Sequence, residues 1–568
     1  MTASLPTIDP SLPEGTGMVL PPLRPRFATG TQVWFRSAPI TKQFWGVWNT
    51  SKLTLLEKGF VTRKEGDTWI LDQWLAGKLV DGRLVDGFYR LTAIGIERLE
   101  RAKREQQKPL APIKVEMEFL PLPERLESKL RGYQVQPARQ LLRALRYGKQ
   151  EWGYPGAVAL CDMGTGKTYH TLAAALATGR KVAVFCPPVG KGGWQRAFKH
   201  FGAEPHFLES YEAVRGAWRP EIATMDATGQ FHWSNASEII VILDECQALR
   251  HESTLNFRCF SALLRQGIPC IAASATLALS PVEMKFAGRL VGLHQGGYDW
   301  DRFCHLHGCE RKTKSAPWVW NKDLKHLRNI NEQLFPYRGC RIRKEELGDQ
   351  CPETEIKVLP IRSPEAETIE AQTIASEQTI AALERRQAPK GQIVAMRRNL
   401  RMAIWKKCET ALVPHIARLV KRDVEEGWSV AIFVNFTETR ETLGKLLGTT
   451  AGFFGGQSPK ARQTFERQFQ NEEIHILISN LKAGGASVSL HDVNGIRSRR
   501  AYIFPSDDVI PMEQATGRVD RVGGMSKSEQ FIPCLSGTRM VRTVENIRRK
   551  MMQISTLNDG ADASGSKF

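Results

Sequence analysis

Apolar residues gather in short runs that are separated by segments with helical spacing. Between residues 126 and 360 these runs are AVAL (157–160), KVAVFC (181–186), IIVIL (239–243) and CIAAS (270–274). They consist of β-branched or small residues bounded by Gly, Pro or Asp, a pattern typical of strands buried on both faces of a parallel sheet. A second series follows residue 425: SVAIFVN, HILIS and AYIFP. Two such series predict an α/β fold with two doubly wound domains and a cleft between them.

The same pattern sets the expected domain boundaries. A first lobe is predicted over 126–360 and a second lobe over 426–554. The segment 361–425 is rich in Glu, Ala, Gln, Arg and Ile without strand alternation, which predicts long connecting helices. Residues 555–568 have the composition of a disordered tail.

The N-terminal part of the chain has a different pattern. Residues 1–29 show little periodicity and are rich in proline, which favours an extended arm. Residues 30–105 predict a helix, a turn, two short strands and a helix capped by Thr92. That order is compatible with a winged helix that contacts a duplex and equally with a small α+β packing domain. The Pro-punctuated segment 106–125 predicts a linker.

Length and composition narrow the class of protein. A chain of 568 residues corresponds to about three or four domains of ~150 residues. Its 42% hydrophobic and 24% charged residues are ordinary for a globular protein, so collagen-like, coiled-coil and disordered classes fit poorly. The sequence shows no secretory signal and no run of 18 or more apolar residues, which argues against secretion and membrane spanning.

The eleven cysteines are scattered in apolar contexts and predict buried free thiols rather than a disulfide scaffold. A reducing, intracellular compartment is therefore expected. The compact length, without long low-complexity arms, favours the cytoplasm or nucleoid of a bacterium, or a virus-infected cell, over a nucleus.

Positive charge exceeds negative charge, with 79 Lys and Arg against 60 Asp and Glu, a formal net charge of +19. The excess is local: residues 101–150 hold 12 basic and 5 acidic side chains, whereas residues 1–100 hold 12 and 10. Such positive charge is compatible with binding to nucleic acid, with binding to an anionic membrane, or with solubility alone. Composition does not distinguish among these three roles.

The run AVALCDMGTGKTYHTLAAAL carries the first candidate chemistry. Between an apolar strand and a helix-forming segment it places five candidate nucleotide-binding residues: Gly164, Thr165, Gly166, Lys167 and Thr168. Glycines let backbone N–H groups close around phosphates, the lysine reaches the β and γ oxygens, and Thr168 would offer its hydroxyl to Mg²⁺. The eight-residue P-loop pattern begins with Gly, whereas Cys161 stands at that position here.

The segment EIIVILDECQALRH puts Asp244 and Glu245 directly after a buried apolar strand. Two adjacent carboxylates are costly there unless they coordinate a metal or activate water. We expect Asp244 on Mg²⁺ and Glu245 as the base that orients the attacking water.

The third element is EQATGRVDRVG. On a helix, Gln514, Arg518 and Arg521 would share one face, and Gly517 would permit a close approach. Two such guanidiniums usually belong to a solvated surface, but opposite a nucleotide they would act as arginine fingers. Because the P-loop lies in the first lobe and these residues in the second, ATP is expected between the lobes.

The segment CHLHGC (304–309) suggests a metal site, which Cys340 and Cys351 could complete. Tetrahedral zinc usually takes ligand pairs separated by a longer loop, and the segment holds no CxxC pair. The pattern therefore favours a packed helix over a zinc site.

In their order these motifs resemble those of superfamily 2 nucleic-acid motors, and within them the Swi/Snf-type ATPases, in a distant branch similar to the annealing-helicase (HARP-like) group. The resemblance covers residues 126 to about 550. LRGYQVQPARQLL is similar to the motif ahead of the P-loop, with Gln134 in the place of the adenine-reading glutamine. CDMGTGKT resembles motif I, and VFCPPVGKGGWQRAF, which contains Trp194, resembles motif Ia.

DECQ resembles motif II, with Gln247 where the family usually has His. SATLALSP is similar to motif III, in which Ser274 and Thr276 would couple the nucleotide site to nucleic acid. SVAIFVNFTETRETL resembles motif IV. SNLKAGGASVSL resembles motif V, in which Gly485 would be a coupling residue, and QATGRVDRVG resembles motif VI.

The resemblance implies two RecA-like P-loop lobes with parallel sheets, next to the small N-terminal α+β domain. It implies ATP and Mg²⁺ as cofactors and duplex DNA as the partner, held across both lobes by backbone contacts. The expected activity is that of an ATP hydrolase acting as a DNA translocase or helicase, with the N-terminal domain recognising DNA or a protein partner. An ATP-gated clamp or scaffold without processive movement, and an RNA-directed motor, remain as alternatives.

Candidate phosphate contacts are basic residues of both lobes, and a solvated charged face explains them almost as well. They are RIRK (341–344), Arg497, Arg499 and Arg500.

Overall fold

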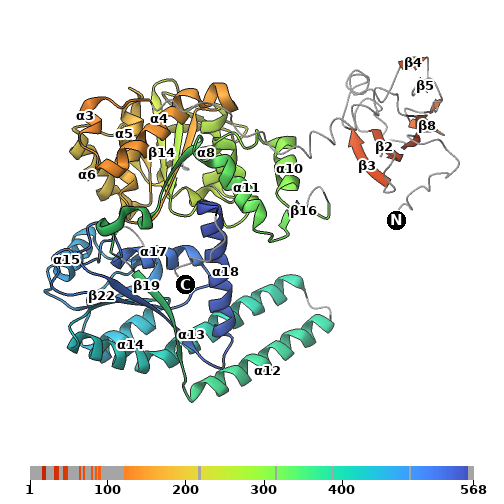
Figure 1. Ribbon diagram of the computed structural model, residues 1–568. Coiled ribbons are helices and arrows are strands. Elements are labelled where there is room, and N and C mark those ends of the chain that lie inside the picture. Colours follow the sequence, from red (N-terminus) through yellow and green to blue (C-terminus); the bar gives the residue numbers. More distant parts are fainter. Residues whose placement is uncertain are drawn as a thin grey trace. The chain divides into compact units, whose positions relative to one another are not determined.

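Figure 1 shows the computed structural model of the chain, which forms two compact units, Met1–Ala111 and Pro112–Phe568. The structure describes eight strand segments between residues 16 and 90 and the chain from 120 to 560, without residues 215–218, 314–315, 353, 387–388 and 485–487.

The first unit contains two antiparallel four-stranded sheets. One has the strand order β3-β2-β1-β8 and the other β4-β5-β6-β7. The bounds are β1 Thr16–Leu20, β2 Thr31–Arg36, β3 Gln43–Trp48, β4 Arg63–Glu65, β5 Thr68–Ile70, β6 Lys78–Val80, β7 Arg83–Val85 and β8 Gly87–Arg90.

In this first unit, strands occupy segments that were predicted to be an extended arm or a helix. β1 lies inside the segment 1–29 that was expected to be an extended arm, because its backbone pairs with both β2 and β8. β3 occupies the start of the segment for which a helix was expected. The helix expected after Thr92 lies outside the described residues. The described residues of this unit all lie in β-strands, whereas residues 49–62 and 91–111 lie outside the described residues, so the winged helix stays a prediction.

The first lobe of the second unit is built on a six-stranded parallel sheet of order β11-β10-β14-β15-β9-β18. All four strands predicted from apolar runs are present, and β9, β14 and β15 are buried along their whole length. The bounds are β9 Gly156–Cys161, β10 Lys181–Phe185, β11 Phe207–Glu209, β14 Ile239–Asp244, β15 Cys270–Ser274 and β18 Gly339–Ile342.

Helices cover both faces of this sheet (Figure 1). They are α3 Glu124–Glu127, α4 Gly132–Trp152, α5 Lys167–Leu176, α6 Lys191–Phe201, α7 Tyr211–Val214, α8 Leu255–Arg265, α9 Lys285–Leu290, α10 Gly297–Leu306 and α11 Lys325–Leu334. Two short hairpins are added, β12 Ala223–Met225 with β13 Phe231–Trp233, and β16 Cys309–Glu310 with β17 Val319–Trp320.

The second lobe carries a five-stranded parallel sheet of order β19-β23-β22-β20-β21. Its strands are β19 Thr354–Ile361, β20 Ser429–Val434, β21 Ile476–Asn480, β22 Arg499–Ile503 and β23 Ser528–Leu535. Its helices are α12 Glu365–Arg385, α13 Lys390–Glu425, α14 Thr437–Leu447, α15 Pro459–Gln470, α16 Leu481–Gly484, α17 Val509–Val519 and α18 Met540–Asp559. With the first sheet, this completes the predicted pair of RecA-like lobes, and α12 and α13 are the long helices expected before the second sheet.

Two expected boundaries differ from the structure. The first lobe was expected to reach residue 360, but β19 belongs to the second sheet because its whole length hydrogen-bonds with β23. The disordered tail was expected from residue 555, but α18 continues to Asp559 because Leu557 is fully buried in the core of the first lobe. No helix among the described residues is long and apolar enough to cross a membrane.

Candidate nucleotide-binding site between the two lobes

The P-loop connects the end of β9 to the first residue of α5. Gly164 and Gly166 have φ angles of +81° and +75°, a region that favours glycine. A Cβ on Gly164 would lie 2.7 Å from Cγ of Arg521, and one on Gly166 would lie 2.6 Å from Nε2 of Gln134. Both glycines are therefore required by the conformation of the loop and by its close neighbours.

Two side chains of α4 brace this loop. Tyr133 donates its hydroxyl to the Thr165 carbonyl at 3.2 Å, and Gln134 donates Nε2 to the Gly166 carbonyl at 3.2 Å. The other end of the Gln134 amide accepts from the Arg131 backbone N–H at 3.1 Å. Gln134, expected to read adenine, thus contacts the P-loop backbone in this structure.

The two carboxylates lie where β14 ends, directly opposite the P-loop lysine. Nζ of Lys167 is 2.9 Å from Oε1 of Glu245 and 3.3 Å from Oδ1 of Asp244. Burial would lower the pKa of Lys167, but the two carboxylates outweigh it and raise that pKa above its ordinary value. Burial raises the pKa of Asp244. Burial would also raise the pKa of Glu245, but the Lys167 ammonium and the hydrogen bond from Gln247 together outweigh it and lower that pKa.

Residues that fit Mg²⁺ are present at the same place. Asp244 is buried, its Oδ2 accepts from Nε1 of Trp194 at 2.9 Å, and its backbone carbonyl accepts from the Tyr211 hydroxyl at 2.7 Å. Thr168 follows Lys167 in the first turn of α5. A fixed carboxylate and a hydroxyl are hard oxygen donors of the kind that Mg²⁺ prefers, so this pair fits the ion.

A chain of hydrogen bonds leads from Glu245 to the second lobe. Gln247 donates Nε2 to Oε2 of Glu245 at 2.6 Å and accepts from the Ser274 hydroxyl at 2.7 Å. The Ser274 hydroxyl also accepts from the Thr276 backbone N–H at 2.9 Å, and the Thr276 hydroxyl donates to Glu513 of α17. Gln247 can serve in place of the family's His because its amide offers one donor and one acceptor.

Helix α17 contacts the P-loop through a glycine. A Cβ on Gly517 would lie 2.6 Å from Cβ of Met163, a distance that no side chain would tolerate without movement. Three residues away, Gln514 donates Nε2 to Oε2 of Glu245 at 3.4 Å. The close approach expected of Gly517 is therefore present, and it brings motif VI against the nucleotide site.

Both arginines of this motif lie at the lobe interface. Arg521 donates to the Ser489 hydroxyl at 2.8 Å and to the Val488 carbonyl at 2.7 Å, and Arg518 donates to the same carbonyl at 3.4 Å. Burial and the neighbouring Arg521 guanidinium lower the pKa of Arg518 to about 9. Gly485, expected to couple the lobes, lies outside the described residues.

Some residues of the site were not singled out from the sequence. Glu513 directly precedes Gln514 in the motif VI helix, so its position in the sequence could have identified it as a residue of the site. Tyr211 is a lone tyrosine in a short helix, and nothing in the sequence marks it as a neighbour of Asp244.

The basic residues expected to contact phosphates are used inside the protein instead. Arg341 pairs with Asp162 at 2.6 Å and with Asp559 at 2.8 Å, and Lys344 pairs with Asp520 at 2.8 Å.

In the second lobe, Arg499 pairs with Glu472 at 2.6 Å and Arg500 with Asp423 at 2.8 Å. Arg497 donates to the Val424 carbonyl at 2.6 Å. The expectation was wrong for these residues, because their guanidinium and ammonium groups bind acidic partners and carbonyls of the core and the lobe interface.

The cysteines are all free and buried, as predicted. Within the described residues, CHLHGC does not bring three metal-ligating atoms together, and Cys340 instead lies near Cys161 and His170.

No family model matches the chain. A protein of Acanthamoeba polyphaga mimivirus, L364, named an ATP-dependent RNA helicase, is 26% identical over 440 residues, which cover 72% of this chain and 80% of that protein. YwqA of Bacillus subtilis (strain 168), named an ATP-dependent helicase/translocase, is 23% identical over 468 residues, which cover 71% of this chain and 46% of YwqA. The chain thus spans about half the length of YwqA.

Two solved structures have a weak overall similarity to this chain. S. cerevisiae Dbp5 bound to RNA and ADP BeF3 has a TM-score of 0.43 at 13% identity, covering 76% of this chain and 92% of Dbp5. The DUF1998 helicase MrfA bound to DNA and AMPPNP has a TM-score of 0.43 at 14% identity, covering 79% of this chain and 57% of MrfA.

The sequence is thus similar to two proteins named ATP-dependent helicases, which agrees with the resemblance of its motifs to those of superfamily 2 nucleic-acid motors. The finer resemblance to the Swi/Snf-type branch stays a prediction.

Proposed function

We propose that the chain is an ATP-dependent translocase or helicase that couples ATP hydrolysis between its two lobes to movement on duplex DNA. The observation that carries this proposal is the hydrogen-bond chain from Glu245 through Gln247, Ser274 and Thr276 to Glu513. It joins the carboxylate expected to orient water in the first lobe to the arginine-bearing helix of the second lobe.

ATP would bind where Lys167 now pairs with Asp244 and Glu245. The β- and γ-phosphates would attract the Lys167 ammonium, and Glu245 would then be free to orient the attacking water. Gln134 would lie beside the adenine. Mg²⁺, held by Thr168 and Asp244, would supply positive charge to the phosphate oxygens.

Arg518 and Arg521 would stabilise the charge that develops on the γ-phosphate. Burial and the neighbouring Arg521 guanidinium lower the pKa of Arg518 to about 9. The γ-phosphate would offer both guanidiniums an anionic partner and so would favour their charged forms.

Closure and opening of the lobes would follow the state of the nucleotide. Gln514 donates to the same Glu245 oxygen that Gln247 contacts, so a change at Glu245 reaches both lobes. Movement on DNA would come from repeated closure of this kind, with the duplex held by backbone contacts. The N-terminal unit would act as an accessory domain for DNA or for a protein partner.

A triplex-displacement assay tests the proposal. We expect the purified chain to strip a third strand from duplex DNA only with ATP present, because displacement requires movement along the duplex. ATP-dependent DNA binding without displacement would instead identify a clamp. Stronger stimulation of hydrolysis by single-stranded RNA than by duplex DNA would identify an RNA-directed motor, the substrate class named for the mimivirus relative.

A further inference from the structure

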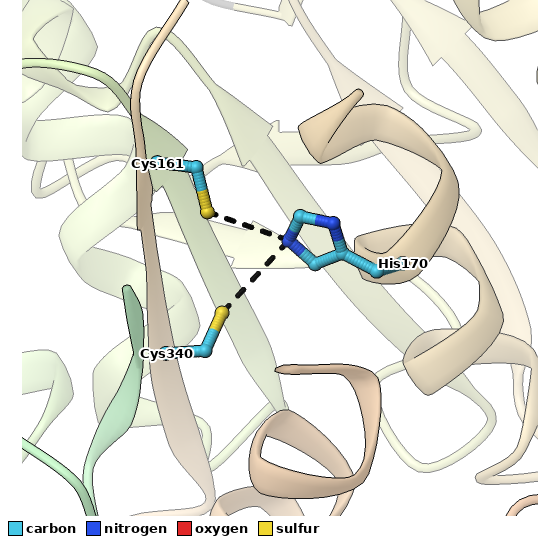
Figure 2. A group of neighbouring side chains, drawn as sticks. All are labelled: Cys161, His170 and Cys340. Carbon is cyan, nitrogen blue, oxygen red and sulfur yellow. Dashed lines mark hydrogen bonds between the residues drawn. The ribbon is translucent and has the colours of Figure 1, made fainter. Parts of the chain in front are cut away.

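Three ligand-type side chains gather directly behind the P-loop, outside the residues assigned to ATP. Cys161 ends β9, His170 lies on α5, and Cys340 lies on β18 (Figure 2). Sγ of Cys161 is 3.5 Å and Sγ of Cys340 is 3.8 Å from Nε2 of His170, and the three atoms lie within 4.8 Å of one another. The three side chains are at most 1% exposed.

The fold explains why these residues meet. β9 and β18 are parallel neighbours in which Cys161 pairs with Ile342 and Cys340 pairs with Ala159. Cys340 and Ile342 are two residues apart and so share a face of the sheet, which places both thiols on the same face. Figure 2 shows both sulfur atoms directed at one nitrogen of the His170 ring on α5.

We propose that Cys161, His170 and Cys340 form a structural Zn²⁺ site. Thiolate and imidazole are the ligands that Zn²⁺ prefers, and the observed spacing suits the ion. With Zn–S of about 2.3 Å and Zn–N of about 2.0–2.1 Å, tetrahedral geometry puts sulfur and nitrogen about 3.5 Å apart. The two sulfur-to-nitrogen distances are 3.5 and 3.8 Å.

Hydrogen bonding alone accounts poorly for this group. Nε2 of a neutral histidine makes one bond, either as donor or as acceptor, whereas two thiols approach it here. Nδ1 of the buried His170 has no hydrogen-bond partner among the described residues, so the ring is held through Nε2.

Charge also favours a divalent ion. On binding, both thiols would lose their protons to solvent, and two sulfur–zinc bonds and one nitrogen–zinc bond would form. The two thiolate charges would then offset the charge of Zn²⁺, and a water bound to the ion would complete its four ligands. The ion would join β9, α5 and β18, the three elements around the P-loop, at the position where the P-loop pattern has Gly and this chain has Cys161.

Metal uptake by the refolded full chain tests this proposal. Because the ligands are buried, the ion must enter as the lobe folds, so the chain is unfolded with a chelator and refolded with Zn²⁺ or Co²⁺ alone. We expect one Zn²⁺ per chain and, with Co²⁺, a thiolate-to-metal charge-transfer absorption. Cys161→Ala and Cys340→Ala should each lose this absorption and weaken Zn²⁺ binding at least about tenfold.

Cys259→Ala is the matched control, because Cys259 is also a fully buried thiol of the first lobe and is outside the group. It should retain Zn²⁺. A folded wild-type chain that takes up no metal, or equal losses in all three variants, would overturn the proposal.

Zinc-edge X-ray absorption identifies the atoms around the ion in the wild-type chain, so it tests the site even if a variant does not fold. Two sulfur neighbours at about 2.3 Å and one nitrogen at about 2.0–2.1 Å are expected, and a shell of only nitrogen and oxygen contradicts the site. These readouts do not depend on ATP hydrolysis, so the zinc site and the proposed motor activity can fail separately.

Discussion

At the scale of single residues, the cations of the nucleotide site are bound by other groups of the protein. Lys167 is held by two carboxylates, and the guanidinium of Arg521 donates to neutral oxygens of Gly517, Val488 and Ser489. An arriving nucleotide offers each of these cations a stronger anionic partner.

Arg521→Ala tests the finger role. ATP binding should stay within a few fold of wild type, whereas hydrolysis per bound ATP should fall by about 10³ because the developing charge loses its partner. Nucleotide titration and single-turnover hydrolysis measure the two quantities. Arg467→Ala, an exposed arginine of α15, should change neither. A loss of binding equal to the loss of hydrolysis would refute the role.

Glu513 makes the lobe contact sensitive to pH. Burial and the carboxylates of Asp162 and Glu245 raise its pKa from 4.5 to about 8, although the Thr276 hydroxyl and Arg341 act against them. Because the folded pKa is the higher one, the contribution to stability is complete below about 4.5 and is lost as the pH rises to about 8.

Glu513→Gln should remove this dependence, since the amide keeps an acceptor for Thr276 and does not ionise. Between about pH 5 and 9, the unfolding free energy of the wild type relative to the variant should fall by about 4 kcal/mol. Thermal unfolding at several pH values measures it. A constant difference between the two proteins would show that Glu513 does not titrate in this range.

Most of the residues grouped around the nucleotide site could be predicted because loop glycines, a lysine and paired carboxylates have a chemistry that their spacing reveals. The basic residues could not, because a sequence shows a positive charge but not the acidic partner that binds it. Arg341 and Asp559 are far apart in the chain, and only the fold brings them together.

At the scale of elements, the contact between α17 and the P-loop depends on the absence of a side chain. Gly517 lies so close to Met163 that even a methyl group requires movement of one lobe against the other. Strands were predicted where both faces are buried. β19 was assigned to the wrong lobe because its largely exposed residues carry no such signal and its partner β23 comes much later in the chain.

Gly517→Ala should hinder lobe closure without weakening the helix. Alanine is more favourable than glycine in a helix by about 1 kcal/mol. The contact of its Cβ with Met163 would, however, oppose closure of the lobes by about 1–3 kcal/mol. The rate of stimulated ATP hydrolysis should therefore fall about tenfold. Gly391→Ala in α13 is the matched control, since a Cβ there meets nothing within 4 Å. Unchanged hydrolysis in Gly517→Ala would contradict this account of the interface.

At the scale of the whole second unit, α18 joins the two lobes. Val544, Ile547 and Ile554 lie in the core of the second lobe, whereas Leu557 lies in the core of the first. Asn558 donates to the Ala275 carbonyl at 2.8 Å, which adds a polar contact at the same end of the helix. The sequence did not reveal this role, because one buried leucine next to a Gly- and Ser-rich end resembles a tail.

Leu557→Ala should therefore loosen the lobes from each other. The cavity should cost about 2–5 kcal/mol, and calorimetry should show the single unfolding transition broadening or dividing into two. Val541→Ala, on the same helix but 39% exposed, should have little effect. An unaltered transition in Leu557→Ala would mean that α18 does not couple the lobes.

We propose that nucleic acid drives the hydrolysis of ATP at the P-loop. Its most direct test is the rate of ATP hydrolysis with duplex DNA, single-stranded DNA and RNA, for the wild type, for Lys167→Ala and for the exposed control Lys199→Ala. We predict strong stimulation of the wild type by duplex DNA, the same stimulation in Lys199→Ala, and no hydrolysis above background in Lys167→Ala. Hydrolysis retained by Lys167→Ala, or a wild-type rate that no nucleic acid changes, would contradict the account.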